Sequence, residues 1–326
     1  MNDGAGAPRP TVALSGATGF IGTALLQKLL DGGWPVRALY RPRRGRALAD
    51  APGLSWIAGE LSDRAALASW LSGAQVVIHC AGAVRGARRA DFDQVNEHGV
   101  REVVDAAVRE PACRRFLLLS SLAARMPQLS DYAGSKWRGE RVLAANAGRL
   151  GWTVLRPPAV YGPGDREMLP LFRSMRRGWA PLPGRGEGRF SLLYVEDLAT
   201  AIVAWLTQDG LDGEIHELDD GRAGGYDWDT LLATAARVLR QGAPIRRVPL
   251  PLPLLRAVAG INLVAARLLG YAPMLTPGKV REIAHPDWVC DGGAFVRATG
   301  WRPRYDFERG LASTLGRPAT AAHGTF

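Results

Sequence analysis

Three side chains near the middle of the chain have the types and spacing needed for acid–base chemistry. Tyr132 and Lys136 stand four residues apart in a stretch that is typical of a helix, which places them on one face, one turn apart. Because a nearby ammonium stabilises a phenolate, we expect Lys136 to lower the pKa of Tyr132 from its ordinary value of about 10. Ser121 ends an apolar strand shortly before them, where its hydroxyl could bind the same substrate oxygen. The three residues predict proton exchange between Tyr132 and a substrate.

A sheet and its helices are needed to hold these residues in place. Apolar runs typical of strands lie at residues 12–14, 35–40, 54–58, 76–80, 115–120 and 152–156. Segments with helical periodicity separate them. This alternation indicates an α/β protein with a parallel sheet.

A glycine turn follows the first strand and precedes a helix predicted at residues 23–30. Gly16 would permit a tight turn, Gly19 the close approach of a phosphate, and Gly22 close packing of the helix on the strand. The helix N-terminus would then attract a pyrophosphate through its unpaired N–H groups and partial positive charge. A flexible turn is the plainer alternative, but the position of the turn in the alternating pattern favours a dinucleotide site.

The end of the second strand favours one nicotinamide cofactor over the other. An acidic residue there would bind the free 2′-hydroxyl of NAD, whereas arginine favours the 2′-phosphate of NADP. The chain has Tyr40 and Arg41 at this point, with Arg43 and Arg44 close behind and no carboxylate. We therefore expect NADP(H) in preference to NAD(H), the alternative being a solvated basic loop.

Four separated motifs make the chain resemble the extended short-chain dehydrogenase/reductase family, also called the NAD-dependent epimerase/dehydratase family. They are the glycine turn, Ser121 with Tyr132 and Lys136, the stretch R-P-P-A-V-Y-G-P-G at 156–164, and Y-V-E-D-L-A at 194–199. The resemblance covers residues 11 to about 315, with a weaker match at 299–303. It implies a doubly wound Rossmann sheet formed by 11–164 and 191–206. A smaller, discontinuous C-terminal substrate domain would comprise 165–190 and 207–315, with loose tails at 1–10 and 316–326.

The resemblance also assigns expected roles. Tyr132 is the implied catalytic acid/base, Lys136 tunes it and binds the nicotinamide ribose, and Ser121 orients the substrate. Pro157 would lie beside the nicotinamide, Asn96 matches the family's helix asparagine, and Glu60 could reach the adenine or be an ordinary surface carboxylate. The full set predicted to contact the cofactor is Gly16, Thr18, Gly19, Phe20, Ile21, Gly22, Arg41, Arg44, Glu60, Leu61, Ala81, Gly82, Asn96, Tyr132, Lys136, Pro157 and Val160.

The segment between Ser121 and Tyr132 departs from part of the family. It is shorter than in the nucleotide-sugar epimerases and dehydratases, and it has Leu122 and Ala123 where the dehydratases carry acidic residues. It is more similar to atypical members, including the accessory NADPH-binding subunit of respiratory complex I. We therefore expect an oxidoreductase that transfers hydride between nicotinamide C4 and a carbonyl or secondary alcohol. A redox-neutral nucleotide-sugar epimerase or dehydratase, and a non-catalytic NADPH-binding assembly or sensing protein, are the alternatives.

Composition limits the other classes of function. The formal charge is +10, but the arginines are spread along the chain without a basic run between aromatics, so nucleic-acid binding is not expected. Three distant cysteines and five unclustered histidines predict buried thiols and no metal site. Residues 1–10 lack a basic start followed by an apolar run, so we expect a cytoplasmic protein without a secretory signal.

One apolar stretch, residues 248–270, stands out in the second half. Arg256, Asn262 and Arg267 interrupt it, which argues against a transmembrane span. It could contact a membrane surface or form the wall of a pocket for an apolar or lipid-like small-molecule substrate. A core helix of the substrate domain is the preferred interpretation.

Family members often pair through the helix that carries the tyrosine and lysine, so a homodimer is expected.

Overall fold

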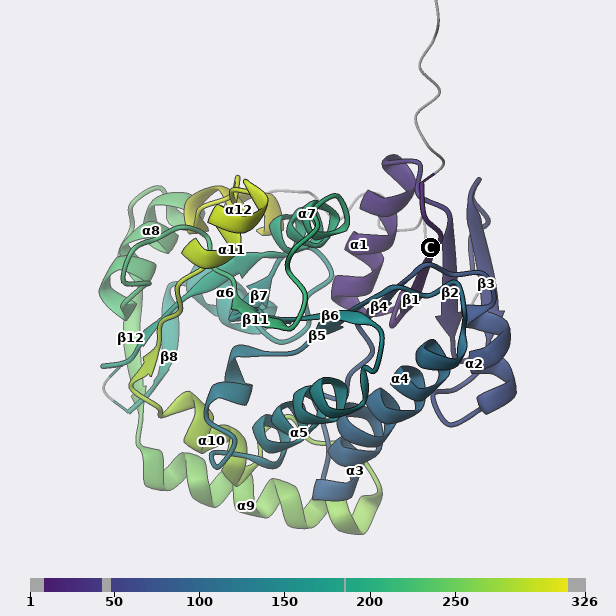
Figure 1. Ribbon diagram of the computed structural model, residues 1–326. Helices are drawn as coiled ribbons and strands as arrows, with labels where there is room; N and C mark the ends of the chain where they lie inside the picture. Colours follow the sequence, from purple (N-terminus) through teal and green to yellow (C-terminus); the bar gives the residue numbers. More distant parts are fainter. Residues whose placement is uncertain (1–8, 43–47, 185, 316–326) are drawn as a thin grey trace, which may run out of the picture.

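Seven parallel strands form the central sheet in the computed structural model, which describes residues 9–42, 48–184 and 186–315 (Figure 1). Their order across the sheet is β11-β6-β5-β4-β1-β2-β3. This is the doubly wound order of a Rossmann fold, with β11 added at one edge, and it confirms the expected fold class. The strands are β1 (Val12–Ser15), β2 (Val36–Tyr40), β3 (Leu54–Ala58), β4 (Val76–His79), β5 (Arg115–Leu119), β6 (Gly151–Arg156) and β11 (Glu214–Glu217).

The sheet is built outward in two directions from β1. Val12 pairs with Val36 of β2 on one side and with Val76 of β4 on the other. The chain first adds β2 and β3, and then returns across β1 to add β4, β5 and β6. In open α/β sheets such a reversal leaves a crevice at the carboxyl ends of the strands, where ligands bind. Here the crevice lies after β1 and β4.

Helices cover both faces of the sheet (Figure 1). On one face α1 (Phe20–Asp31) and α7 (Val195–Leu206) pack together, and Leu25, Leu29 and Trp205 are fully buried. On the other face lie α2 (Arg64–Leu71), α4 (Gly99–Arg109) and α5 (Asp131–Asn146). Because both faces are covered, the strands read as continuous apolar runs rather than as alternating ones.

A second, smaller unit packs around its own aromatic core. Tyr161, Phe172 and Phe307 meet there edge to face or tilted, with ring centroids 5.7–5.9 Å apart. Its elements are β7 (Ala159–Tyr161), α6 (Leu169–Arg176), β8 (Trp179–Pro183), β9 (Arg189–Phe190), β10 (Leu192–Tyr194), α8 (Trp228–Arg240), β12 (Arg246–Leu250), α9 (Leu252–Leu269), α10 (Pro277–Ile283), β13 (Asp287–Trp288) and α12 (Phe307–Leu315). Thr276 caps α10 and Asp227 caps α8.

The boundary between the two units differs from the expected one. The sequence predicts that all of 207–315 belongs to the substrate domain, yet β11 pairs with β6 in the central sheet. Conversely, β7 and β10 lie in the ranges predicted for the Rossmann domain, but Tyr161 and Tyr194 pack in the aromatic core of the second unit. The helix α11 (Gly293–Thr299) also joins the sheet, since Phe295 and Trp301 are buried in the same core as Trp205. The short β11 sequence E-I-H-E has no apolar run, so only its pairing with β6 identifies it as part of the sheet.

The helix α9 is more exposed than expected. The preferred interpretation of the stretch 248–270 is a core helix, but only Ala259 and Ala266 of α9 are buried. Among the described residues it is the one helix whose length and composition would suffice to cross a membrane, and 11% of it is buried. Since apolar residues surround the whole helix, its sequence could not show which side, if any, packs inward.

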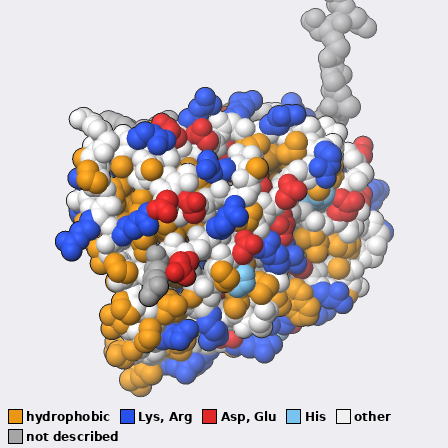
Figure 2. Space-filling view, turned by 90° about the vertical axis from the view of Figure 1, so that its left-hand side faces the viewer, with side chains coloured by type: hydrophobic (Ala, Val, Ile, Leu, Met, Phe, Trp, Pro, Cys, Tyr) orange, Lys and Arg blue, Asp and Glu red, His pale blue; other side chains and the backbone are white. Residues whose placement is uncertain are grey.

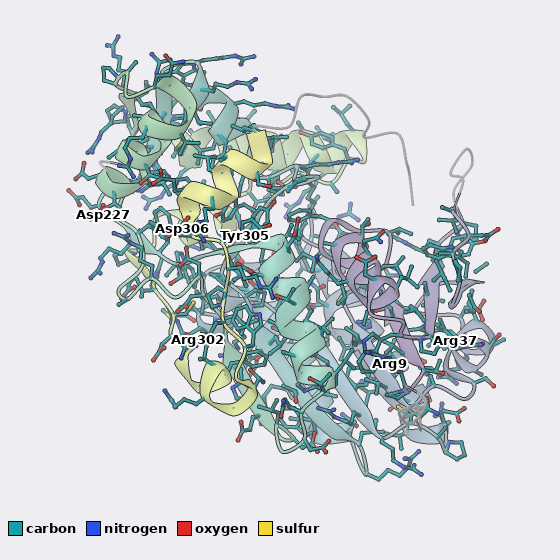
Figure 3. The ribbon with its side chains drawn as sticks, turned by 90° about the horizontal axis from the view of Figure 1, so that it is seen from above. Arg9, Arg37, Asp227, Arg302, Tyr305 and Asp306 are labelled. Carbon is teal, nitrogen blue, oxygen red and sulfur yellow. The ribbon has the colours of Figure 1, made fainter. Side chains whose placement is uncertain are left out.

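A buried carboxylate fixes the C-terminal segment onto α7. Asp197 in the first turn of α7 is 1% exposed and accepts the backbone N–H groups of Arg304 at 3.0 Å and Tyr305 at 2.9 Å. Figure 3 shows Tyr305 and Asp306 where this segment enters α12. The carboxylate therefore attaches the end of the chain to the first unit before α12 enters the second.

We predict that Asp197→Ala lowers the free energy of unfolding by about 3 kcal/mol, because two backbone donors lose their acceptor. Urea denaturation followed by circular dichroism measures this change. The exposed Asp50→Ala is the matched control, and it should stay within about 0.5 kcal/mol of the parent. Equal stabilities of the two variants would contradict the anchoring role.

Candidate active site

The carboxyl ends of β5 and β6 bring Ser121 and Tyr132 together. The N–H of Leu122 donates to the carbonyl oxygen of Pro157 at 2.9 Å, which holds the turn after β5 against the end of β6. Ser130 caps α5 by accepting the N–H of Ala133 at 2.9 Å, so Tyr132 lies in the first helical turn. From there its hydroxyl forms a hydrogen bond with Ser121. The structure therefore brings these two predicted site residues together.

The electrostatic surroundings of Tyr132 differ from those expected. Burial raises the pKa of Tyr132, and the Ser121 hydrogen bond and the charge of Lys279 offset only part of that rise. The cation that faces the ring is Lys279, whose Nζ lies 5.7 Å from the ring centroid. The expectation that Lys136 lowers the pKa below its ordinary value is therefore wrong for this structure, because Lys136 points toward β5 instead.

Lys136 is held at the end of β5 by a buried network. Its Nζ donates to the carbonyl oxygen of Leu119 at 2.8 Å. Burial lowers the pKa of Lys136 to about 8, and the charge of Glu140, one turn along α5, opposes the shift. Glu140 itself is 3% exposed and is bound by Arg156 through two bonds, Nε to Oε1 at 2.9 Å and Nη2 to Oε2 at 2.5 Å. The hydroxyl of Ser120 also donates to Glu140.

The glycine turn has the shape that a dinucleotide requires. Gly16 has φ +72°, and a Cβ there would lie 2.7 Å from the N atom of Ala81. A Cβ at Gly22 would lie 2.0 Å from the carbonyl oxygen of Gly16, so α1 packs directly on the turn. At Gly19 the nearest atom would be 3.3 Å away, and within the described residues no side chain caps α1 at this position. The N-terminal amides of α1 can therefore receive a phosphate, and these residues fit a pyrophosphate.

A π-helix, Gln94–His98, places Asn96 beside the end of β4. Its amide accepts the N–H of Ala83 and donates to the carbonyl oxygen of the same residue, both at 2.9 Å, and it also donates to Ser135 at 2.9 Å. A side chain at Gly82 would come within 3.3 Å of both Asn96 Oδ1 and Lys136 Nζ. The backbone at Gly82 therefore runs close to both polar groups, which suits the close passage of a cofactor.

The other predicted cofactor residues lie around the same crevice, with one exception. Arg41 is exposed just after β2 and Glu60 is exposed after β3, while Leu61 packs near Gly99 of α4. Phe20 and Ile21 form the first turn of α1, and Thr18 precedes that turn. Ala81 follows β4 and Pro157 is buried after β6. Val160 packs against the hydrophobic core of the first unit. Arg44 lies outside the described residues.

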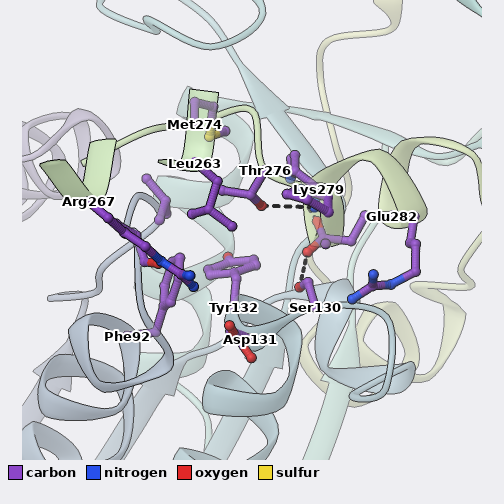
Figure 4. A pocket seen from close by; sticks show the side chains of 16 residues that line it. Phe92, Ser130, Asp131, Tyr132, Leu263, Arg267, Met274, Thr276, Lys279 and Glu282 are labelled. Atoms are coloured by element: carbon purple, nitrogen blue, oxygen red, sulfur yellow. Dashed lines mark hydrogen bonds and ion pairs between the residues drawn. The ribbon is translucent and has the colours of Figure 1, made fainter. Parts of the chain in front are cut away.

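A pocket of about 180 Å³ opens beside Tyr132 (Figure 4). Phe92 of α3 (Arg89–Asp93) contacts the tyrosine ring at a centroid distance of 6.3 Å, and Leu263 and Met274 contribute further apolar surface. Lys279 contributes an ammonium, which is paired with Glu282 at 2.7 Å, and Ser130 donates to the same carboxylate. The pocket thus combines an apolar wall with polar groups near the tyrosine.

Sequence reasoning missed the pocket residues that come from the second unit. The Thr-Pro pair at 276–277 is typical of a helix start, and α10 with Lys279 and Glu282 begins there. This signal gives no indication that the helix faces Tyr132, because the pairing depends on how the two units pack. One sequence-based alternative did involve this pocket, namely that residues 248–270 form the wall of an apolar substrate pocket. Leu263 and Arg267 of α9 line the pocket beside Tyr132.

Comparisons with known proteins agree with this architecture. The model of the NAD dependent epimerase/dehydratase family matches residues 12–218. A protein of Caulobacter vibrioides named ceramide reductase is 37% identical over 91% of this chain and 97% of its own length. An Arabidopsis thaliana protein named NADH dehydrogenase [ubiquinone] 1 alpha subcomplex subunit 9, mitochondrial, is 29% identical over 75% of this chain and 61% of its own. The structure of the Bordetella bronchiseptica enzyme WbmH in complex with NAD+ superposes with a TM-score of 0.71, 20% identity, and coverage of 94% of this chain and 98% of that one.

We predict that Lys136 titrates near pH 8 in the free protein and that Glu140→Gln lowers its pKa further, because the variant removes the negative charge that opposes burial. The chain has only three lysines, so NMR titration with carbon-13-labelled lysine gives few signals, and Lys136→Arg assigns the relevant one. Lys279 is the internal control. Burial lowers its pKa, but Glu282 more than offsets that effect and raises the pKa overall. A Lys136 signal that titrates near the ordinary lysine value of about 10.4 would contradict the buried network.

Proposed function

The chain belongs to the NAD dependent epimerase/dehydratase family, and from that premise we propose that it is an NADP(H)-preferring oxidoreductase that reduces the carbonyl group of an apolar, lipid-like substrate. The observation that carries the proposal is the pair of hydroxyls, Tyr132 and Ser121, beside a pocket with an apolar wall. The relative named ceramide reductase supports both the direction and the lipid class, since it matches nearly the whole chain.

Tyr132 supplies the proton in this proposal. Its raised pKa keeps the phenol protonated at neutral pH, so it can give its proton to the oxygen as the carbonyl becomes a secondary alcohol. Ser121 donates a hydrogen bond to the same oxygen and orients it. Lys136 holds the cofactor ribose, and the nicotinamide, when bound, supplies the hydride that the carbonyl carbon receives. The tyrosine then regains its proton from solvent.

The redox-neutral alternative has less support. Leu122 and Ala123 lie in a 3-10 helix directly after Ser121 and are 3% and 9% exposed, so no carboxylate is offered at this position. The sugar-nucleotide enzymes among the similar structures are at most 22% identical, which supports the fold alone. A second candidate is an NADPH-binding protein without turnover, which the relative named as a subunit of NADH dehydrogenase favours.

We predict that Tyr132→Phe lowers kcat for reduction by roughly a hundredfold or more, because the proton donor is lost. The measurement is NADPH consumption with a panel of long-chain ketolipids, together with NADPH affinity, which should change little. Tyr305→Phe is the matched control, since that hydroxyl lies near Glu196 on α7 and not in the pocket. A variant that reduces the substrate at the parent rate would refute the mechanism. A parent protein that binds NADPH tightly yet reduces no member of the panel would move the second candidate forward.

We predict that Arg41→Asp weakens NADPH binding by roughly tenfold or more and leaves NADH binding within about threefold, because only NADPH carries a 2′-phosphate for the guanidinium. Isothermal titration calorimetry of each cofactor measures both affinities. Arg297→Asp makes the same charge change at an exposed position on α11 and should leave both affinities unaltered. Parent protein that binds NADH as tightly as NADPH would overturn the cofactor preference.

A further inference from the structure

Helix α9 presents a continuous apolar face that nothing in the described part of the chain covers. Leu254, Val258, Ile261, Val264 and Leu268 follow one another at spacings of three or four residues, which places them on one side of the helix. Their exposed fractions run from 45% for Val258 to 80% for Leu268. Exposed apolar side chains gathered in this way are uncommon on a monomer and mark an interaction surface.

The opposite side of α9 is fixed to the rest of the molecule. Ala259 and Ala266 are buried, and the Asn262 amide donates to the carbonyl oxygen of Leu275 at 2.8 Å. Near the C-terminal end, Arg267 donates to the carbonyl oxygen of Ala87 at 3.2 Å. Figure 1 shows α9 lying lengthwise along one edge of the molecule, beside α10. The apolar face therefore points away from the protein along the whole length of the helix.

The charged residues of α9 itself are all of one sign. The helix contains no Asp or Glu, and its charged residues are Arg256 and Arg267, which lie three turns apart on one flank of the apolar face. Arg88 is exposed next to Ala87, which Arg267 contacts. In Figure 2 orange side chains gather at the lower left edge of the molecule with blue ones beside them. An apolar face with flanking arginines is the composition of a helix that lies in a membrane interface.

We propose that α9 docks the protein on the surface of an anionic lipid bilayer, with its axis in the membrane plane. The apolar face would enter the boundary of the acyl chains, and the exposed Arg256 on its flank would meet the lipid phosphates, while Arg267 stays bound to Ala87. Its 18 residues give a length of about 27 Å, short of the roughly 30 Å hydrocarbon core, and two guanidinium groups would have to be buried in a span. An orientation along the membrane surface therefore suits the length of α9 and keeps its guanidinium groups out of the hydrocarbon core better than a transmembrane span would.

Docking would also place the candidate active site at the membrane. Leu263 and Arg267 line the pocket beside Tyr132 as well as belonging to α9. A lipid-like substrate would then reach the pocket from the bilayer without crossing water. Delivery of the substrate from the bilayer rests on the proposed function. The docking does not, because vesicle binding can be measured without enzymatic turnover.

The experiment is flotation of the full-length protein with vesicles of phosphatidylcholine alone or mixed with equal parts of phosphatidylglycerol. The parent should bind the mixed vesicles and release from them at high salt. Ile261→Glu should weaken that binding roughly tenfold or more, because it places a carboxylate among the acyl chains. Ile215→Glu makes the same change at a 45% exposed position on β11 and should bind like the parent. Arg256→Gln should weaken binding to mixed vesicles by roughly fivefold.

Three outcomes would overturn the docking proposal. The parent could fail to bind mixed vesicles, or Ile261→Glu could bind them as the parent does. Alternatively, sedimentation could show a dimer that Ile261→Glu converts to a monomer while vesicles bind neither form, which would assign the face to a second copy. Leu268→Glu, at an 80% exposed position, repeats the test should Ile261→Glu not fold by circular dichroism. Retained vesicle binding without ketolipid reduction would refute the proposed function and leave the docking intact.

Discussion

The buried ion pair between Glu140 and Arg156 is the interaction on which the candidate site depends. A carboxylate at 3% exposure is costly unless it is fully paired, and the fork of Arg156 with the hydroxyl of Ser120 provides that pairing. The pair joins α5 to the ends of β5 and β6, and so fixes the helix that carries both Tyr132 and Lys136. Tyr132 and Lys136 are therefore held at the crevice by a fixed helix rather than by a loop.

Much of the first unit could be predicted from the sequence because its signals are local. Each buried strand is an apolar run, and the glycine turn has a steric reason at Gly16 and Gly22. The properties that depend on distant contacts could not be predicted in the same way. The pKa of Tyr132 is set by burial, by the hydrogen bond with Ser121 and by the charge of Lys279, and the burial and the Lys279 charge do not follow from the spacing between Tyr132 and Lys136.

The second unit shows the same limit in another form. Apolar residues lie around most of α9 and are interrupted only by Arg256, Asn262 and Arg267, so its sequence is compatible with a core helix, an interfacial helix or a pocket wall. The fold buries Ala259 and Ala266 and leaves Ile261 and Leu268 outside. Likewise, the assignment of β11 to the sheet depends on its register with Thr153 to Arg156 rather than on its own residues. In both cases tertiary packing decides the outcome that local patterns leave open.

The chain passes between the two units repeatedly, and this has a mechanical consequence. It leaves the sheet after β6, returns at α7, continues into β11, leaves again for α8, and comes back through α11 before ending in α12. Asp197 adds a fixed attachment where the last crossing is made. Two bodies joined by several crossings of the chain can open only about an axis that every crossing allows. Together with the Asp197 attachment, the crossings favour small relative displacements of the two units, so the pocket between α5 and α10 would admit a substrate mainly by movements of side chains and helices.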